Sequence, residues 1–159
     1  MYRVDFELRG LPALGLNSRR HWRRVAKENG AWTRAVRFAV LGRLPTQALE
    51  QAELVLTRYS SVEIEGDNLQ GSFKPIRDAL ELNEKTAWPG VFVKDDRRCL
   101  GIPTYRWRKA APRDGHITGE VLDLEAYLAR CETRGPEDLD LAAIERRFQL
   151  LRAADPLEE

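Results

Sequence analysis

The sequence predicts a small α/β domain of the α+β type, in which a mixed sheet is packed by helices and an extra C-terminal helix follows. Two segments have the pattern of strands, because Tyr2–Leu8 alternates apolar with polar residues and Glu53–Tyr59 is rich in β-forming residues. Between them, Ala31–Leu41 carries apolar residues at helical spacing. The chain has 159 residues, 43% of them hydrophobic and 32% charged, so it is long enough for one domain with a sizeable core.

The first half of the chain divides into elements at its glycine and proline residues. Tyr2–Leu8 is expected to form a half-buried strand, and Pro12–Ser18 a loop. The amphipathic helix over Ala31–Leu41 ends where Gly42 follows it. Glu53–Tyr59 then forms a central strand of the sheet, directly before an acidic segment.

The second half is expected to begin with a helix over Phe73–Leu82, for which Ser72 is the N-cap. Leu100–Trp107 returns as a strand, and the proline within it favours an edge position. Thr118–Leu124 fits either a last strand or the start of a helix. Asp138–Ala154 carries apolar residues on one face at helical spacing and is expected to form the extra C-terminal helix.

The sequence indicates neither a membrane protein nor a secreted one. It has no run of about 18 apolar residues, and its first residues lack the apolar core of a signal peptide. The two cysteines, Cys99 and Cys131, lack the close spacing of zinc-binding or redox pairs. We therefore expect a cytoplasmic protein with two reduced, packed thiols, and a disulfide between them is the alternative.

Two acidic motifs flank the predicted Phe73–Leu82 helix. Glu65 and Asp67 would point to the same side of an extended segment, and Asp95 and Asp96 would reach the same point if the helix returns the chain. Mg²⁺ prefers oxygen ligands and commonly takes one or two carboxylates together with substrate phosphates; Mn²⁺ suits the same ligands. The pattern therefore predicts a metal site formed by these four residues. The alternative is that two solvated acidic turns flank a surface helix.

Lys74 lies near the start of the same predicted helix and would face the metal site as a point charge for a phosphate. A metal lowers the pKa of bound water, and a lysine stabilises the negative charge that develops in the transition state. Such a combination suits phosphodiester hydrolysis, with Lys74, Asp67 and Asp96 as the catalytic residues. Asp78 lies four residues after Lys74 and is expected to form a salt bridge with it rather than to bind the metal.

A basic arm lies ahead of the first predicted helix. The segment between Arg19 and Arg43 contains eight lysine and arginine residues, opposed by Glu28 alone. Arginine clusters neutralise phosphates, and a nearby aromatic residue can stack on an unpaired base. Trp22 is as well suited to the core as to such stacking. The predicted DNA-binding residues are Asn17, Arg19, Arg20, His21, Arg23, Arg24 and Lys27.

Taken in order, these motifs resemble those of the RusA-type Holliday-junction resolvases, in particular the divergent forms of phages and prophages. The similarity covers roughly Tyr2–Leu124, and its specific part is Asp67-Asn68-Leu69-Gln70, then Lys74-x3-Asp78-Ala79-Leu80, then Asp95-Asp96. Asp67 matches the second aspartate of the family's Asp-x-Asp motif, and Asp96 matches the essential second member of its Asp-Asp pair. Lys74 matches the motif lysine. Glu65 replaces the first aspartate, and Gly71–Phe73 are extra.

The resemblance implies a Mg²⁺-dependent endonuclease that works as a homodimer and cuts four-way DNA junctions in recombination or repair, inside a bacterial cell. Residues 1–125 would form the nuclease domain, and residues 126–159 a helical extension packed on it. Glu65 and the longer loop before Lys74 suggest, as an alternative, a branched-DNA-binding module without cleavage. A third function, suggested by the acidic C-terminal extension, is that of a protein-interaction adaptor.

Overall fold

The structure is a computed structural model, and it describes residues 1–10, 22–64, 66–101 and 103–133. In chain order the elements are β1 (Arg3–Arg9), α1 (Trp22–Val40), the 3₁₀ turn η1 (Leu41–Arg43), β2 (Ala52–Ser60), α2 (Gly66–Ser72), α3 (Lys74–Leu80), the 3₁₀ turn η2 (Glu84–Thr86), α4 (Arg97–Leu100), β3 (Thr104–Lys109), β4 (His116–Asp123) and α5 (Leu124–Thr133). The strands form one mixed sheet in the order β1-β4-β2-β3, in which only β2 and β3 are parallel among the described neighbours. The predicted α+β class is confirmed.

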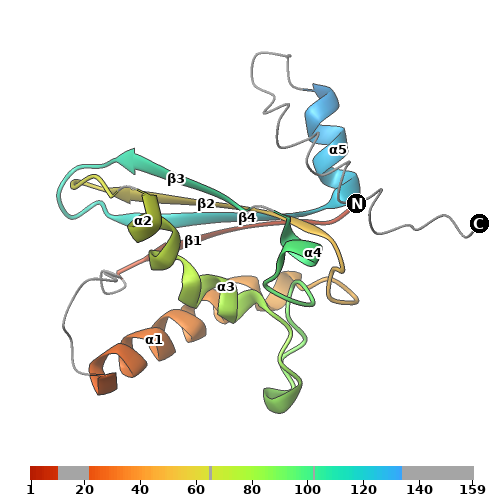
Figure 1. The fold of residues 1–159 in the computed structure, drawn as a ribbon, viewed down its shortest axis with the longest axis horizontal. Coiled ribbons are helices and arrows are strands. Elements are labelled where there is room, and N and C mark those ends of the chain that lie inside the picture. The colour runs from red at the N-terminus through yellow and green to blue at the C-terminus, as the bar shows by residue number, and fades with distance from the viewer. Residues whose placement is uncertain (11–21, 65, 102, 134–159) are drawn as a thin grey trace, which may run out of the picture.

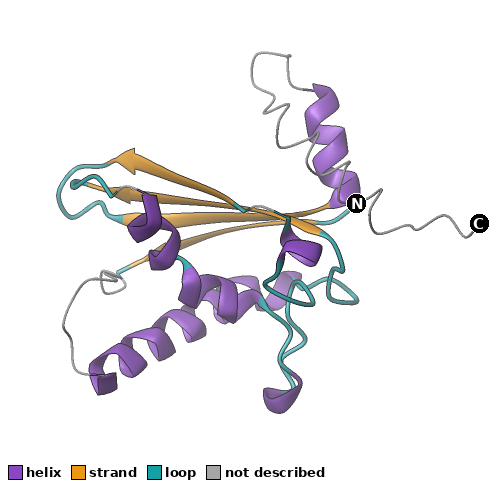
Figure 2. Ribbon diagram, in the orientation of Figure 1, coloured by secondary structure: helices purple, strands orange, loops and turns teal. Residues whose placement is uncertain are grey.

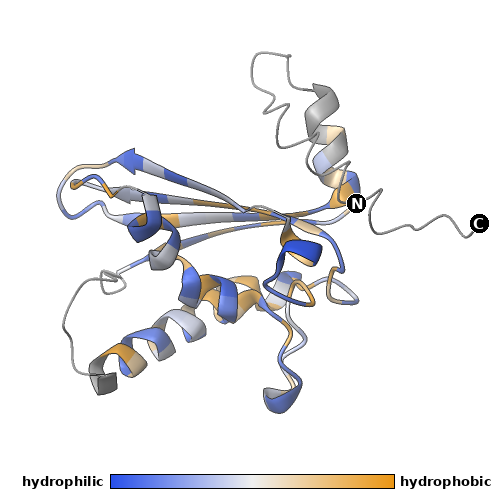
Figure 3. Cartoon of the chain, in the orientation of Figure 1, coloured by the Kyte–Doolittle hydropathy of each residue, from blue (hydrophilic) through white to orange (hydrophobic). Residues whose placement is uncertain are grey.

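Helices cover the two sides of the sheet unequally. Helices α1, α3 and α4 lie on one side, and α5 rises from the other side at the end of β4 (Figure 1). Figure 2 shows the strands as a single layer beside these helices. Hydrophobic residues gather where α1 and α3 meet (Figure 3), and Val36, Val40, Ile76 and Leu80 are completely buried there. The main core therefore lies between the sheet and the α1–α3 layer.

Strand β1 has the alternation that its sequence predicts. Val4, Phe6 and Leu8 are at most 5% exposed and face the core, whereas the residues between them are exposed. Gly119 of β4 lies opposite Phe6, and a Cβ atom at position 119 would lie 2.1 Å from Cζ of that ring. Glycine is therefore required there by close packing. The predicted central strand, Glu53–Tyr59, is also confirmed, since β2 pairs with β4 on one side and with β3 on the other.

Three helix predictions need correction. Helix α1 begins at Trp22 rather than at Ala31, because the arginine, lysine, alanine and glutamate residues ahead of Ala31 are good helix formers without an apolar stripe. Ser72 is not an N-cap but the last residue of α2, and its hydroxyl donates to the Leu69 carbonyl (2.7 Å). Helix α3 spans Lys74–Leu80, so it ends two residues earlier than predicted.

Strands β3 and β4 complete the sheet by pairing with β2 and β1. Thr118–Leu124 fitted either a strand or the start of a helix; all of it except Leu124 belongs to strand β4, and Leu124 begins helix α5. The predicted edge strand is confirmed as β3, but it begins at Thr104 rather than at Leu100, which belongs to helix α4. Pro103 therefore lies just before the strand and not within it. Helix α5 begins at Leu124, so no break in secondary structure separates residue 125 from residue 126. The predicted helix over Asp138–Ala154 lies outside the described residues.

The side chain of Cys99 is buried, and its Sγ donates to the Leu49 carbonyl at 3.3 Å. This agrees with the prediction of a packed thiol, while the side chain of Cys131 lies outside the described residues. None of the helices in the described part of the chain has both the length and the apolar character needed to cross a membrane.

Candidate active site

The connection from β2 to α2 carries the first acidic motif. The Trp107 indole of β3 donates to Oγ of Ser60 (2.9 Å) and to the carbonyl of Val62 (3.0 Å), which fixes this connection against the sheet. Helix α2 begins one residue before Asp67, so Asp67 lies in the first turn of a helix rather than on an extended segment. The extended conformation on which the shared projection of Glu65 and Asp67 depended is therefore wrong at Asp67. Glu65 lies outside the described residues.

The helical conformation of α2 follows from what it buries. Leu69 is 8% exposed and Phe73, four residues later, is completely buried, so one turn of helix places both apolar side chains against the core. A carboxylate in the first turn also interacts favourably with the helix dipole. Asp67 lies seven residues before Lys74, which corresponds to roughly 10 Å of helical rise. It is thus at the end of α2 that lies away from α3.

A tight return of the chain brings the second acidic motif beside α3. The Leu82 N–H donates to the Phe92 carbonyl at 2.9 Å, which pairs the segment after the turn with the end of α3. Gly90 has a φ of +69°, and a Cβ atom there would lie 2.4 Å from the Leu82 nitrogen, so the two backbones approach too closely for any other residue. The chain therefore reaches Asp95 alongside α3.

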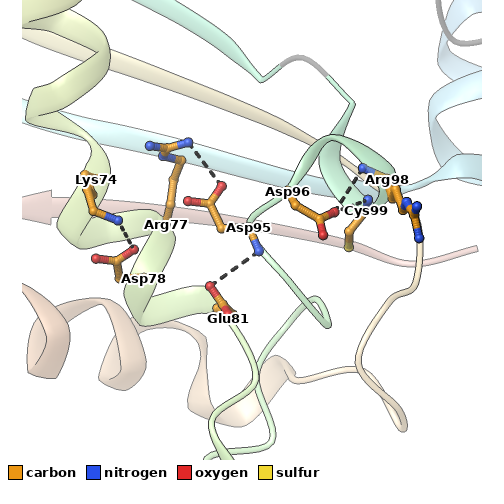
Figure 4. Close-up of polar contacts among 8 residues, drawn as sticks. All are labelled: Lys74, Arg77, Asp78, Glu81, Asp95, Asp96, Arg98 and Cys99. Carbon is orange, nitrogen blue, oxygen red and sulfur yellow. Dashed lines mark hydrogen bonds and ion pairs between the residues drawn. The ribbon is translucent and has the colours of Figure 1, made fainter. Parts of the chain in front are cut away.

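Arg77 and Asp95 form a largely buried ion pair, with 3.1 Å between Nη1 and Oδ1 (Figure 4). Their side chains are 16% and 11% exposed. The guanidinium also lies over the Tyr105 ring, 5.9 Å from its centroid, and the Asp95 N–H donates to Oε2 of Glu81 (3.4 Å). The sequence-based reasoning missed Arg77, Glu81 and Tyr105. The spacing of Lys74, Arg77 and Glu81 on one helix face was the available signal.

Lys74 and Asp78 form the ion pair that their spacing predicts, with 2.9 Å between Nζ and Oδ1. Both side chains are at least half exposed, so the pair contributes little to stability, about 0.3–0.5 kcal/mol. The pair therefore leaves Lys74 able to exchange its partner for a phosphate at a small cost in free energy.

The charge of Asp95 is held in an unfavourable environment. Burial raises the pKa of Asp95 above its ordinary value, the Arg77 guanidinium opposes this shift, and the neighbouring charges of Asp78, Lys74 and Asp96 act on it as well. We call these five charged groups, which interact through Asp95, the Asp95 cluster: Lys74, Arg77, Asp78, Asp95 and Asp96. Such a combination of burial and specific charge partners is typical of functional sites, although structural ion pairs also produce it.

Asp96 caps helix α4. Its Oδ1 accepts from the N–H groups of Arg98 (2.9 Å) and Cys99 (3.0 Å) (Figure 4). Its Oδ2 lies 3.9 Å from Nζ of Lys94. An aspartate at this position stabilises a helix by about 0.5–2 kcal/mol. The sequence places Asp96 in a turn, so this capping role depends on a short helix that the sequence-based reasoning did not predict.

The donor atoms of the cluster suit a hard divalent cation in part. Asp95 and Asp96 make their hydrogen bonds to described residues through Oδ1, so Oδ2 of each remains for another ligand. Carboxylate oxygens are what Mg²⁺ prefers. Among the described residues, however, no three His, Cys, Asp or Glu side chains gather closely enough to hold a metal. The charges of Lys74 and Asp96 act on Asp95, although the Asp96 carboxylate is directed at the start of α4, and Asp67 lies on the separate helix α2.

The predicted basic arm is described only in part. Asn17, Arg19, Arg20 and His21 lie outside the described residues, and Arg23 and Arg24 lie in the first turn of α1. Lys27 is exposed on the next turn. The side chain of Trp22, predicted either to join the core or to stack on a base, lies outside the described residues.

No family model matches this sequence, and no curated protein matches it. The features of this chain that bear on its function are therefore the Asp95 cluster, the charge of the surrounding surface and the sequence motifs.

Proposed function

We propose that this protein is a metal-dependent endonuclease of the RusA type, which acts on four-way junctions or other branched DNA in recombination or repair. The observation that carries the proposal is the Asp95 cluster. It gathers Lys74, Asp95 and Asp96 from segments that are 21 or more residues apart in the sequence, and it includes a half-buried carboxylate. Two carboxylates able to hold a metal, Asp95 and Asp96, beside the cationic side chains of Lys74 and Arg77 suit a phosphodiester substrate better than they suit a neutral one.

In this proposal the residues of the cluster have separate roles. Oδ2 of Asp95 and of Asp96 would bind Mg²⁺ or Mn²⁺, with Glu65 and Asp67 as the further ligands that the motif supplies. A bound metal would activate water and neutralise the scissile phosphate. Arg77 holds Asp95 in place, and Lys74 would leave its exposed pair with Asp78 to bind a phosphate oxygen.

The direct test is cleavage of a synthetic four-way junction with Mg²⁺ by the wild type and by Asp67→Asn, Asp95→Asn and Asp96→Asn. We expect each variant to lose at least about 100-fold in rate, since each would remove charge that acts on the metal or its water. The matched control is Asp114→Asn, which changes an exposed aspartate in the turn between β3 and β4. Cleavage that is equal in all four proteins would contradict the site assignment.

A branched-DNA-binding module without cleavage is the second candidate function. It is favoured by one observation, which is that both aspartates of the second motif already have structural roles: Asp95 pairs with Arg77, and Asp96 caps α4. This candidate predicts tight, salt-sensitive binding of junctions and no cleavage with Mg²⁺ or Mn²⁺. The homodimer implied by the resemblance belongs to both candidates, and light scattering of the purified protein measures it.

A further inference from the structure

One row of side chains crosses the whole sheet at the end where β2 leads into α2. The strand register places Arg9 of β1 opposite His116 of β4, His116 opposite Tyr59 of β2, and Tyr59 opposite Arg108 of β3. Residues directly opposite each other in a sheet point to the same face. Arg9 alternates with the core-facing residues of β1, so this row lies on the face away from α1 and α3. We call it the Tyr59 row.

The two central members of the Tyr59 row are stacked on each other. The rings of Tyr59 and His116 are 4.2 Å apart between centroids and nearly parallel, with 6° between their planes. Nδ1 of His116 lies 2.8 Å from the Asp114 carbonyl, which holds the imidazole in this position. Both side chains are only half-buried, so their outer surfaces remain accessible. An ordered aromatic pair on a sheet is the kind of surface on which an unpaired base can stack.

Two exposed arginines lie on the β3 side of this row. Arg106 and Arg108 are exposed, two residues apart on the same face of β3, and make no ion pair with the described residues. On the β1 side basic and acidic groups are paired, because Arg9 pairs with Glu7, and Arg3 pairs both with Asp5 and with Glu120 of β4, each at 3.0 Å. The net field of this part of the face is therefore positive beside β3.

A hollow of about 490 Å³ adjoins the Tyr59 row on the same face. Thr57 and Thr118 lie in its floor, one pairing row before Tyr59, and Arg106 lines its β3 side. Helix α5 covers only the far end of this face, where Leu122 is buried. The row and the hollow together thus form an extended surface that the described residues leave uncovered.

We propose that the Tyr59 row and Arg106 bind a single strand of nucleic acid. Arg106 and Arg108 would contact consecutive phosphates, and an unpaired base would stack on the Tyr59–His116 pair. The occupant is chosen by charge complementarity, since Arg106 and Arg108 are exposed and make no ion pair with the described residues, whereas the acidic groups Asp5, Glu7 and Glu120 on the β1 side are paired with Arg3 or Arg9. The inference rests on the proposed function in that the strand would be an unpaired part of the same branched substrate. Tyr59 lies eight residues before Asp67, and the row lies at the same end of the sheet as α2 (Figure 1).

The test is binding of fluorescein-labelled oligo(dT), followed by anisotropy without divalent metal over a range of salt concentrations. In Arg106→Ala/Arg108→Ala we expect affinity to fall about tenfold and the salt dependence to weaken by roughly 1.4 in log–log slope, about 0.7 for each lost phosphate contact. Tyr59→Leu should weaken binding about fivefold with an unchanged slope, because stacking involves no counterion release. The matched control is Lys85→Ala, an exposed lysine in the η2 turn.

Affinities and slopes equal to those of Lys85→Ala would overturn the inference. It would also be overturned if Arg106→Ala/Arg108→Ala changed the oligomeric state in light scattering, since the surface would then belong to a second copy of the chain. Failure here is distinguishable from failure of the proposed function, because oligo(dT) binding needs neither metal nor cleavage. If the wild type cleaves junctions but the variants bind oligo(dT) as well as the wild type does, only the inference about the Tyr59 row is overturned. If the variants bind oligo(dT) more weakly but the wild type cleaves no junction, only the proposed nuclease activity is overturned.

Discussion

Replacement of Arg77 by methionine removes the guanidinium that partners the buried charge of Asp95. The two side chains are 16% and 11% exposed. An exposed ion pair contributes about 0–1 kcal/mol, and breaking a buried one costs about 3–5 kcal/mol. This pair lies nearer to the buried limit, and methionine keeps the apolar stem of the side chain. We therefore expect the free energy of unfolding to fall by about 2–3 kcal/mol at neutral pH.

The assay is urea unfolding followed by circular dichroism, with Lys74→Met as the matched control. Lys74 and Asp78 are 63% and 50% exposed, so that control should change the free energy of unfolding by less than about 0.5 kcal/mol. Arg77→Met combined with Asp95→Asn should recover most of the loss, because no unpaired charge then remains buried. The reasoning is refuted if Arg77→Met costs no more than Lys74→Met, or if the double variant recovers nothing.

Three further outcomes are expected. Asp96→Ala should lower the free energy of unfolding by about 1 kcal/mol in urea while Asp96→Asn changes it little, because asparagine also caps helices; equal losses would argue against the cap. Gly119→Ala should cost about 1–3 kcal/mol in the same assay, and Phe6→Leu in that background should cost less than Phe6→Leu alone, because the added methyl meets the Phe6 ring. Burial raises the pKa of Tyr2 from 10.0 to about 12, so the folded state favours the neutral phenol. Its contribution to stability is therefore constant below pH 10 and is lost as pH rises toward 12; Tyr2→Phe should remove this part of the alkaline decline in urea unfolding, and an identical decline in both proteins would count against it.

The strands were predictable because their signal is local. Alternation of Val4, Phe6 and Leu8 with charged residues specifies a strand with one buried face, whatever its neighbours are. The β-branched and aromatic content of β2 likewise marks a central strand. The ion pair of Lys74 with Asp78 was also predictable, since four residues of helix bring the two side chains together.

The parts of the candidate site that were not predictable depend on contacts distant in the sequence. Helix α2 contains two glycines and an asparagine, which favour turns, and it is helical because Leu69 is buried against the core. Arg77 and Asp95 are 18 residues apart and meet only because the chain returns through Gly90. The capping role of Asp96 was not predictable, because it depends on the short helix α4 that follows it.

The charges along β1 have a consequence for association between chains. In the described sheet β1 is an edge strand, with one row of backbone groups open to pairing. If two copies paired antiparallel about Phe6, Arg3 of one copy would face Arg9 of the other, and Asp5 would face Glu7. Like charges directly opposite each other destabilise strand pairing. The edge is thus protected against sheet extension in that register, and a dimer of this protein would have to form through a different surface or a shifted register.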